Sequence, residues 1–152
     1  MTPRPASIPR RRLIVAGAAA PLALWWRPAA ADAAELEAAI RGFAGAAAVQ
    51  VGRVTLDIAP LVENGNAVPV SVGVDSPMSA TDHVKRIALF NERNPQREVA
   101  VFHLGPHAGR ASIATRIRLA TSQQLVALAE MSDGSVWSRR VDVIVTLAAC
   151  IE

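Results

Sequence analysis

The sequence predicts an all-β fold, an antiparallel β-sandwich with a short helix before its first strand. Beyond residue 53, apolar and polar residues alternate with a period of two in one run after another, which is the pattern of half-buried strands. Clusters of glycine, proline, asparagine and aspartate separate these runs roughly every 8–15 residues. No segment of the length of a crossover helix lies between the runs, which argues against a parallel α/β sheet.

Residues 1–31 have the pattern of an export signal. Three arginines at 10–12 precede an apolar run at 13–24, and three alanines at 29–31 supply a small-residue cleavage site. The apolar run is shorter than the ~20 residues that span a membrane. We therefore expect a twin-arginine signal peptide at 1–31, export to the periplasm, and no membrane contact once the signal is removed. A Sec-type leader and a retained anchor are the alternatives.

The charge balance changes once this leader is set aside. Five of the 16 Lys and Arg residues lie in it, so the remaining 11 face all 13 Asp and Glu residues, a balance of −2. No basic stripe with interleaved aromatic residues follows, which argues against nucleic-acid binding. The remaining length suits one domain of roughly 100–150 residues. We expect a signal peptide at 1–31, a sandwich domain at 32–147 and a C-terminal arm at 148–152.

The helix and strands follow from periodicity and turn residues. Apolar residues at helical spacing predict a helix at 35–43, which Gly42 and Gly45 end. The expected strands are 54–58, 68–74, 83–90, 98–104, 113–119, 125–131 and 136–147. Asp133 and Gly134 mark the hairpin between the last two strands. Seven strands at this spacing are typical of the immunoglobulin type of sandwich. The chain has one cysteine, so no internal disulfide crosses this core.

That cysteine, Cys150, lies close to the C-terminal end of the chain. An unpaired thiol is unusual in an oxidising compartment. A buried, inert cysteine is the alternative, but chain ends usually fray. We expect residues 148–152 to form a flexible arm that carries the thiol into the cleft of another protein. The nearby carboxylate of Glu152 disfavours the thiolate, so the pocket of the partner would have to activate the sulfur.

Other chemistry has weaker support in the sequence. His83, His103 and His107, with a thioether from Met78 or Met131, are candidates for a copper site, although three scattered histidines also occur by chance. Nucleophilic hydrolysis is not indicated, because no base or oxyanion hole can be placed beside a cysteine on a terminal arm. Glycine-rich phosphate loops are absent from the sequence.

Several short motifs occur in a fixed order after the leader. They are Glu63-Asn64-Gly65, Val68-Pro69-Val70-Ser71-Val72, Asp75-Ser76-Pro77-Met78, Ile87-Ala88-Leu89-Phe90, Asn94-Pro95, Thr115-Arg116-Ile117-Arg118-Leu119 and Ala129-Glu130-Met131-Ser132-Asp133-Gly134-Ser135. In this order, and followed by a cysteine near the C-terminus, they resemble the SoxY family, the sulfur carriers of thiosulfate oxidation. The resemblance covers essentially the whole chain after the leader.

The resemblance implies an immunoglobulin-like sandwich that carries a substrate, is not itself an enzyme and has no cofactor of its own. It implies Cys150 as the covalent attachment site for sulfur intermediates derived from thiosulfate, and no other residue as functional. It also implies a heterodimer with a SoxZ-like subunit. Three enzymes would dock transiently: a SoxXA-like haem c enzyme that attaches thiosulfate, a SoxB-like di-manganese hydrolase that releases sulfate, and a SoxCD-like molybdenum–haem enzyme that oxidises the remaining sulfane sulfur.

The C-terminal arm departs from the family pattern. The family tail usually reads Gly-Gly-Cys-Gly-Gly, whereas this chain has Ala148-Ala149-Cys150-Ile151-Glu152, which is stiffer and bulkier. An alternative is therefore a non-loading immunoglobulin-like partner, or a metal-binding subunit of a periplasmic sulfur-oxidation complex. A sulfur-transfer enzyme that acts alone is a further alternative, against which the lack of a placed base or cofactor motif argues.

Two surfaces are candidates for the heterodimer contact, because a small sandwich exposes edge strands that are usually covered. One is the alternating valine strand at 68–74. The other is the face that carries Arg116 and Arg118. The sequence does not choose between them.

Overall fold

The computed structural model describes residues 29–149, and the side chains from Asp32 onward. The chain divides into two units, Met1–Ala31 and Asp32–Glu152. Most of the expected twin-arginine signal, and Cys150 with the two residues that follow it, lie outside the described residues. Among the described residues, no helix combines the length and the apolar character needed to cross a membrane.

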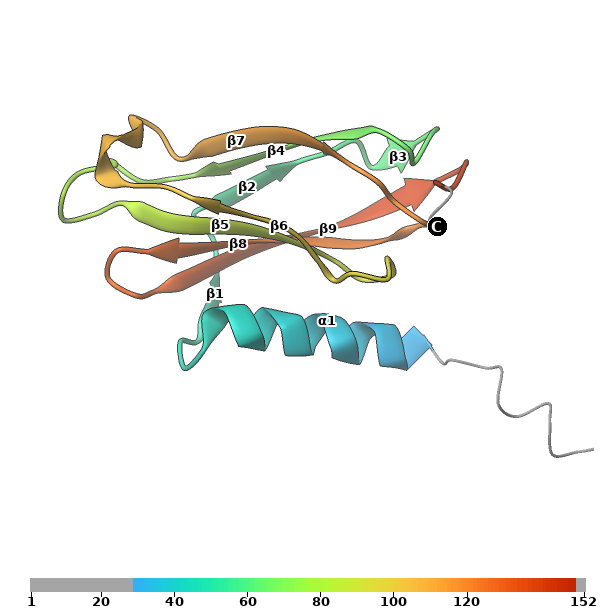
Figure 1. Ribbon diagram of the computed structural model, residues 1–152, viewed down its shortest axis with the longest axis horizontal. Helices are drawn as coiled ribbons and strands as arrows, with labels where there is room; N and C mark the ends of the chain where they lie inside the picture. The colour runs from blue at the N-terminus through green and yellow to red at the C-terminus, as the bar shows by residue number, and fades with distance from the viewer. Residues whose placement is uncertain (1–28, 150–152) are drawn as a thin grey trace, which may run out of the picture. The chain divides into compact units, whose positions relative to one another are not determined.

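Two β-sheets lie face to face, and a helix packs on the outer side of the larger one (Figure 1). In chain order the elements are α1 (Ala29–Ala44), β1 (Val49–Val51), β2 (Val54–Asp57), β3 (Leu61–Val62), β4 (Val68–Val74), β5 (Val84–Asn91), β6 (Glu98–His103), the short helix η3 (Pro106–Ala108), β7 (Ser112–Ile117), β8 (Gln123–Met131) and β9 (Val136–Val145). The larger sheet has the order β1-β9-β8-β5-β6, with β3 also paired to β9, and the smaller sheet has the order β2-β4-β7. The predicted all-β sandwich with a short N-terminal helix is confirmed.

Strand β4 shows how the alternating sequence builds the core between the sheets. Val68, Val70, Val72 and Val74 are all buried, while the residues between them are more exposed. β4 lies between β2 and β7 and is antiparallel to both. Both edges of β4 are therefore paired and its valine face lies in the core. The interpretation of the 68–74 valine strand as a partner surface is wrong for this reason.

Helix α1 covers the outer face of the larger sheet. Leu36 and Ile40 are each only 2% exposed, and they pack in a cluster with Phe90, Val126 and Leu128 from β5 and β8. The helix is longer than the expected 35–43, because the alanines before it favour helix and Gly42 lies inside it. It ends before Gly45, whose φ of +61° is the left-handed conformation that commonly follows a helix.

Two short strands, β1 and β3, were not expected from the sequence. Both pair with β9, and both run parallel to it, whereas the remaining ladders are antiparallel. They contain only three and two residues, too few for a period to be detected. Both strands are defined by their pairing with β9. β3 pairs with Ile144 and Val145 and so holds the C-terminal end of β9.

Candidate functional site

The end of β9 is tied to the segment around β3. The amide of Ile144 donates to the carbonyl of Pro60 at 2.9 Å, and the amide of Thr146 donates to the carbonyl of Val62 at 3.0 Å. The Thr146 hydroxyl also donates to the carbonyl of Glu63 at 3.2 Å. The backbone therefore stays anchored one residue beyond the last residue of β9, in the direction of the cysteine.

The next three residues, Leu147, Ala148 and Ala149, form what we call the tail root. The amide of Gly65 donates to the carbonyl of Leu147 at 2.8 Å, and the amide of Ala149 donates to the carbonyl of Leu119 at 3.1 Å. Between these two contacts, the amide of Leu119 donates to the carbonyl of Gly65 at 2.9 Å. Ala149 is 7% exposed and Leu119 is fully buried. The fixed part of the chain therefore reaches the residue immediately before Cys150.

Gly65 permits this arrangement because it has no side chain. A Cβ atom at this position would lie 2.4 Å from the carbonyl oxygen of Leu119 and 3.0 Å from the amide nitrogen of Ala149. Real Cβ atoms do not approach backbone atoms so closely. Glycine is required here because a side chain would clash with Leu119, and not because of backbone conformation, since the φ angle of Gly65 is not in the left-handed region.

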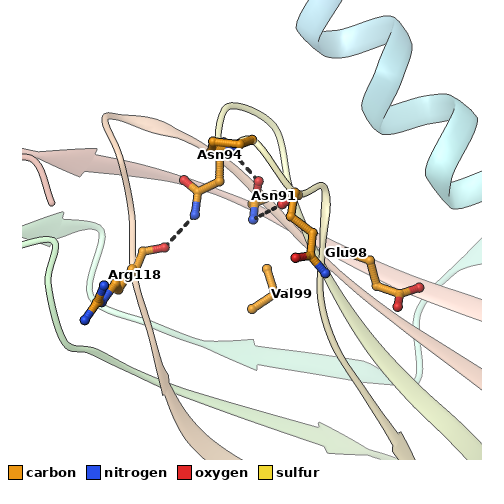
Figure 2. A pocket seen from close by; sticks show the side chains of 7 residues that line it. Asn91, Asn94, Glu98, Val99 and Arg118 are labelled. Atoms are coloured by element: carbon orange, nitrogen blue, oxygen red, sulfur yellow. Dashed lines mark hydrogen bonds between the residues drawn. The ribbon is translucent and has the colours of Figure 1, made fainter. Parts of the chain in front are cut away.

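The side chain of Asn94 holds the segment around Leu119 by hydrogen bonds to Arg118 and Ala120, the residues on either side of Leu119. Its side-chain amide donates to the carbonyl of Arg118 at 2.8 Å (Figure 2). Its side-chain oxygen accepts the amide of Ala120 at 3.0 Å. The side chain of Gln123 donates to the same oxygen at 2.8 Å. Leu119 is thus left to bond with Gly65 and Ala149, while the residues on either side of it bond with Asn94.

A hollow of about 370 Å³ lies beside Asn94 and is lined by Asn91, Pro95, Gln96, Glu98, Val99 and Arg118 (Figure 2). The side chain of Asn91, which is buried, donates to the carbonyl of Gln96 at 3.1 Å, and its oxygen accepts the amide of Asn94 at 3.1 Å. These amides therefore hold the loop between β5 and β6 in place.

The tail root itself offers backbone amides, carbonyls and aliphatic side chains, and its contacts Gly65 and Leu119 add no titratable group. The clear pKa shifts of the described residues lie elsewhere. Burial raises the pKa of Glu130. The hydrogen bonds and positive charges of Lys85 and Arg86 lower this pKa by more than burial raises it, so the pKa falls below its usual range. Hydrogen bonds from Ser135 lower the pKa of Asp133. Glu130 pairs with Val136 at the beginning of β9, at the opposite end of that strand from the tail root.

The candidate copper ligands are not gathered into one site. The ring of His83 contacts the carbonyl of Ser79 at 3.1 Å, and His103 and His107 are exposed on β6 and η3. The sulfur of Met78 accepts the amide of Val84 at 3.5 Å, and Met131 is buried in the core. Within residues 29–149, no three histidine, cysteine or acidic side chains are close enough to hold a metal ion.

Sequence reasoning proposed Cys150, which lies outside the described residues, and missed the residues that anchor the chain before it. Gly65 carried a visible signal, since Asn64-Gly65-Asn66 marks a turn, and the Asn64 side chain does accept the amide of Asn66 at 2.9 Å. Nothing in the sequence indicated that this turn contacts Leu119 and the tail root. Leu119 was expected only as the last residue of the strand at 113–119.

The chain matches the model of a known protein family over most of its length. The family model for the sulfur oxidation protein SoxY matches residues 40–150, a match that includes Gly65, Leu119 and Cys150. No curated protein sequence matches the chain.

Among solved structures, the sulfur carrier protein SoxY from Chlorobium limicola f thiosulfatophilum is similar over 76% of this chain and 99% of its own, with 26% identity and a TM-score of 0.64. A superoxide reductase (neelaredoxin) from Ignicoccus hospitalis matches over 60% of this chain and 78% of its own, with 18% identity and a TM-score of 0.55. A superoxide reductase from Nanoarchaeum equitans matches over 63% of this chain and all of its own, with 12% identity and a TM-score of 0.54. The two reductases share the fold. The family match covers most of the chain, and the chain belongs to the SoxY family of sulfur oxidation proteins.

Proposed function

We propose that this protein is a periplasmic sulfur carrier that binds intermediates of thiosulfate oxidation covalently on Cys150 and presents them to Sox enzymes. The single observation that carries the proposal is the match of the SoxY family model to residues 40–150, a range that ends at Cys150. The solved sulfur carrier that the chain resembles supports the same role. The Ala149–Leu119 hydrogen bond fixes the base from which Cys150 would be presented.

The proposed chemistry needs enzymes besides the carrier. A SoxXA-like haem c enzyme joins the Cys150 sulfur to the sulfane sulfur of thiosulfate; the thiol proton goes to water and the electron pair goes to the haem enzyme. A SoxB-like hydrolase then adds water to the terminal sulfonate, which leaves as sulfate, and a persulfide stays on Cys150. A SoxCD-like enzyme oxidises this remaining sulfane sulfur. In this scheme the carrier supplies the attachment atom and its presentation, and it is not the catalyst.

The proposal includes a SoxZ-like subunit and export by the twin-arginine pathway. The exposed edge strands of the smaller sheet, β2 and β7, support a subunit contact, and β7 carries the exposed Arg116. Replacing Arg11 and Arg12 with lysine should keep the precursor in the cytoplasm if the leader is of this type, and processed protein in the periplasm of such a variant would contradict it. Co-purification of a tagged chain with a small β-rich subunit tests the heterodimer.

Replacement of Cys150 tests the carrier role. Cys150→Ser should abolish growth that depends on thiosulfate while leaving the protein folded and exported at its usual level. In a reconstituted reaction, the wild-type carrier should gain the mass of a thiosulfonate adduct and Cys150→Ser should not. Unchanged growth with Cys150→Ser would instead support a non-loading subunit, the alternative that the Ala148-Ala149-Cys150-Ile151-Glu152 tail keeps open.

A further inference from the structure

Asn64 and Gly65 are neighbours that can react with each other. The backbone nitrogen of a glycine can attack the side-chain carbonyl carbon of a preceding asparagine, because glycine has no side chain to hinder the approach. Asn64 is exposed and Gly65 is buried. Gly65 also lies against Leu119 and Ala149, where it holds the tail root. A reaction at this pair would therefore change the backbone that anchors the end of the domain.

The side chain of Asn64 is held in a state that favours attack. Its oxygen accepts two hydrogen bonds from Asn66, one from the backbone amide at 2.9 Å and one from the side-chain amide at 3.0 Å. Donors on a carbonyl oxygen stabilise the negative charge that develops there when the carbon is attacked. Asn66 thus supplies Asn64 with a small oxyanion site.

The nitrogen of Gly65 is withheld from this reaction. Its N–H donates to the carbonyl of Leu147 at 2.8 Å, and its carbonyl accepts the amide of Leu119 at 2.9 Å. The nitrogen must lose its proton in order to attack, so the hydrogen bond to Leu147 must break first. The electrophile is therefore prepared in the folded protein, while the nucleophile becomes available only when the tail root opens.

We propose that Asn64 is a site of spontaneous deamidation, that opening of the tail root sets its rate, and that the isoaspartate product keeps the tail root from closing again. Hydroxide accepts the proton of the Gly65 nitrogen, and this nitrogen bonds to the side-chain carbon of Asn64. The side-chain nitrogen leaves as ammonia after it takes a proton from water. Water then opens the succinimide ring at one of its two carbonyl carbons, which gives aspartate or isoaspartate at position 64. The inference does not depend on whether Cys150 carries sulfur.

The isoaspartate product changes the length of the backbone before Gly65. The main chain then runs through the former side-chain carbon, which adds one methylene group between residue 64 and Gly65. Gly65 is packed so closely that one added carbon on it would lie 2.4 Å from the carbonyl oxygen of Leu119. The lengthened segment therefore cannot place Gly65 against both Leu147 and Leu119. The aspartate product keeps the original length and leaves the tail root closed.

The first experiment follows deamidation of Asn64 by peptide mass in the full chain at mildly alkaline pH. Asn94→Ala removes the hydrogen bonds that hold the segment around Leu119, and we expect it to deamidate about fivefold faster than the wild type. Glu130→Gln is the control, because Glu130 pairs at the other end of β9, and it should deamidate at the wild-type rate.

Thr146→Val provides a second way to loosen the tail root, since it removes the hydroxyl bond to the carbonyl of Glu63, and it should also react faster. The same chain in urea gives the rate without the fold. Wild-type rates in both loosened variants would overturn the proposal, as would equal acceleration in Glu130→Gln, which would assign the reaction to global unfolding.

The second experiment compares deamidated protein with freshly prepared Asn64→Asp, which has the new charge but not the added methylene group. Hydrogen exchange of the Ala149 amide reports whether the tail root is closed. We expect fast exchange in the fraction that contains isoaspartate and wild-type protection in Asn64→Asp. Equal protection in the two proteins would contradict the lasting release. Loss of protection in both would assign the effect to charge and would also overturn the proposal.

Discussion

The amide of Ala149 donates a hydrogen bond of 3.1 Å to the carbonyl of Leu119, which fixes the residue before the cysteine against the core. Leu119 in turn bonds to Gly65 and is held through its neighbours by Asn94. The chain is therefore anchored up to Ala149, although the sequence predicts a flexible arm from Ala148 onward. Four predictions test this chain of contacts and the fold that supports it.

Gly65→Ala should loosen the tail root. The added methyl group would lie 2.4 Å from the Leu119 oxygen, so the backbone must shift, at an expected loss of about 1–3 kcal/mol of unfolding free energy. The Ala149 amide should then exchange with solvent faster. Gly73→Ala is the matched control, because a Cβ there meets nothing within 4 Å, and it should be neutral or slightly stabilising. Equal denaturation midpoints for the two variants would contradict the close approach.

Asn94→Ala should destabilise the segment that contains Leu119. The substitution removes a donor to Arg118 and an acceptor for Ala120 and Gln123, and we expect a loss of about 1–3 kcal/mol. Asn94→Asp keeps the acceptor but removes the donor, and should fall between the wild type and Asn94→Ala. Denaturation curves of the three proteins measure the order, and an Asp variant less stable than the Ala variant would argue against the acceptor as the main contribution.

Glu130→Gln should make stability less dependent on pH in the acid range. Lys85 donates to the Glu130 carboxylate at 2.9 Å and Arg86 pairs with it from the other side, and together they hold its pKa below the usual range. A lowered folded-state pKa contributes stability above the unfolded value of about 4.3 and loses it as the pH falls through the folded value.

We therefore expect Glu130→Gln to cost about 1–2 kcal/mol at pH 7 and to differ progressively less from the wild type below about pH 4. Denaturant titrations at several pH values measure this difference. Glu98→Gln, at an exposed position on β6, is the control and should shift stability by less than about 0.5 kcal/mol. A Glu130→Gln difference that stays constant from pH 7 to the acid range would contradict the role of its charge.

Leu36→Ala should weaken the packing of α1 on the larger sheet. Leu36 is 2% exposed and packs in the cluster that contains Phe90 and Leu128, so its truncation should cost about 2–5 kcal/mol. Ala38→Ser, on the exposed side of the same helix, should cost less than about 1 kcal/mol. The urea midpoint is the readout, and equal midpoints would show that α1 contributes little to the fold.

The strands with a buried face could be predicted from the sequence, and β4 shows why. Its alternating valines need one buried face, and the expected boundaries, 68–74, agree with those of the strand. Periodicity could not show that β4 is a central strand, so the 68–74 strand stood beside the Arg116 and Arg118 face as a candidate partner surface. Strands β1 and β3 carry too few residues for a period, and only their pairing with β9 defines them.

The candidate site could be predicted only in part. Cys150 stands out chemically as the one cysteine, and a family resemblance gives it a role. The contacts of Gly65, Leu119 and Ala149 depend on tertiary approach between segments far apart along the chain, and all of them run through backbone atoms. Backbone contacts leave no mark of side-chain chemistry in the sequence, except that the closest approach requires a glycine.

The most direct test of the carrier function is the mass of the Cys150 peptide, measured on protein purified from the periplasm of cells grown on thiosulfate, without reducing agents. We expect a population of this peptide with thiosulfonate or added sulfane sulfur, and its loss when the sample is reduced. A Cys150 peptide found only as the free thiol during active thiosulfate oxidation would contradict it.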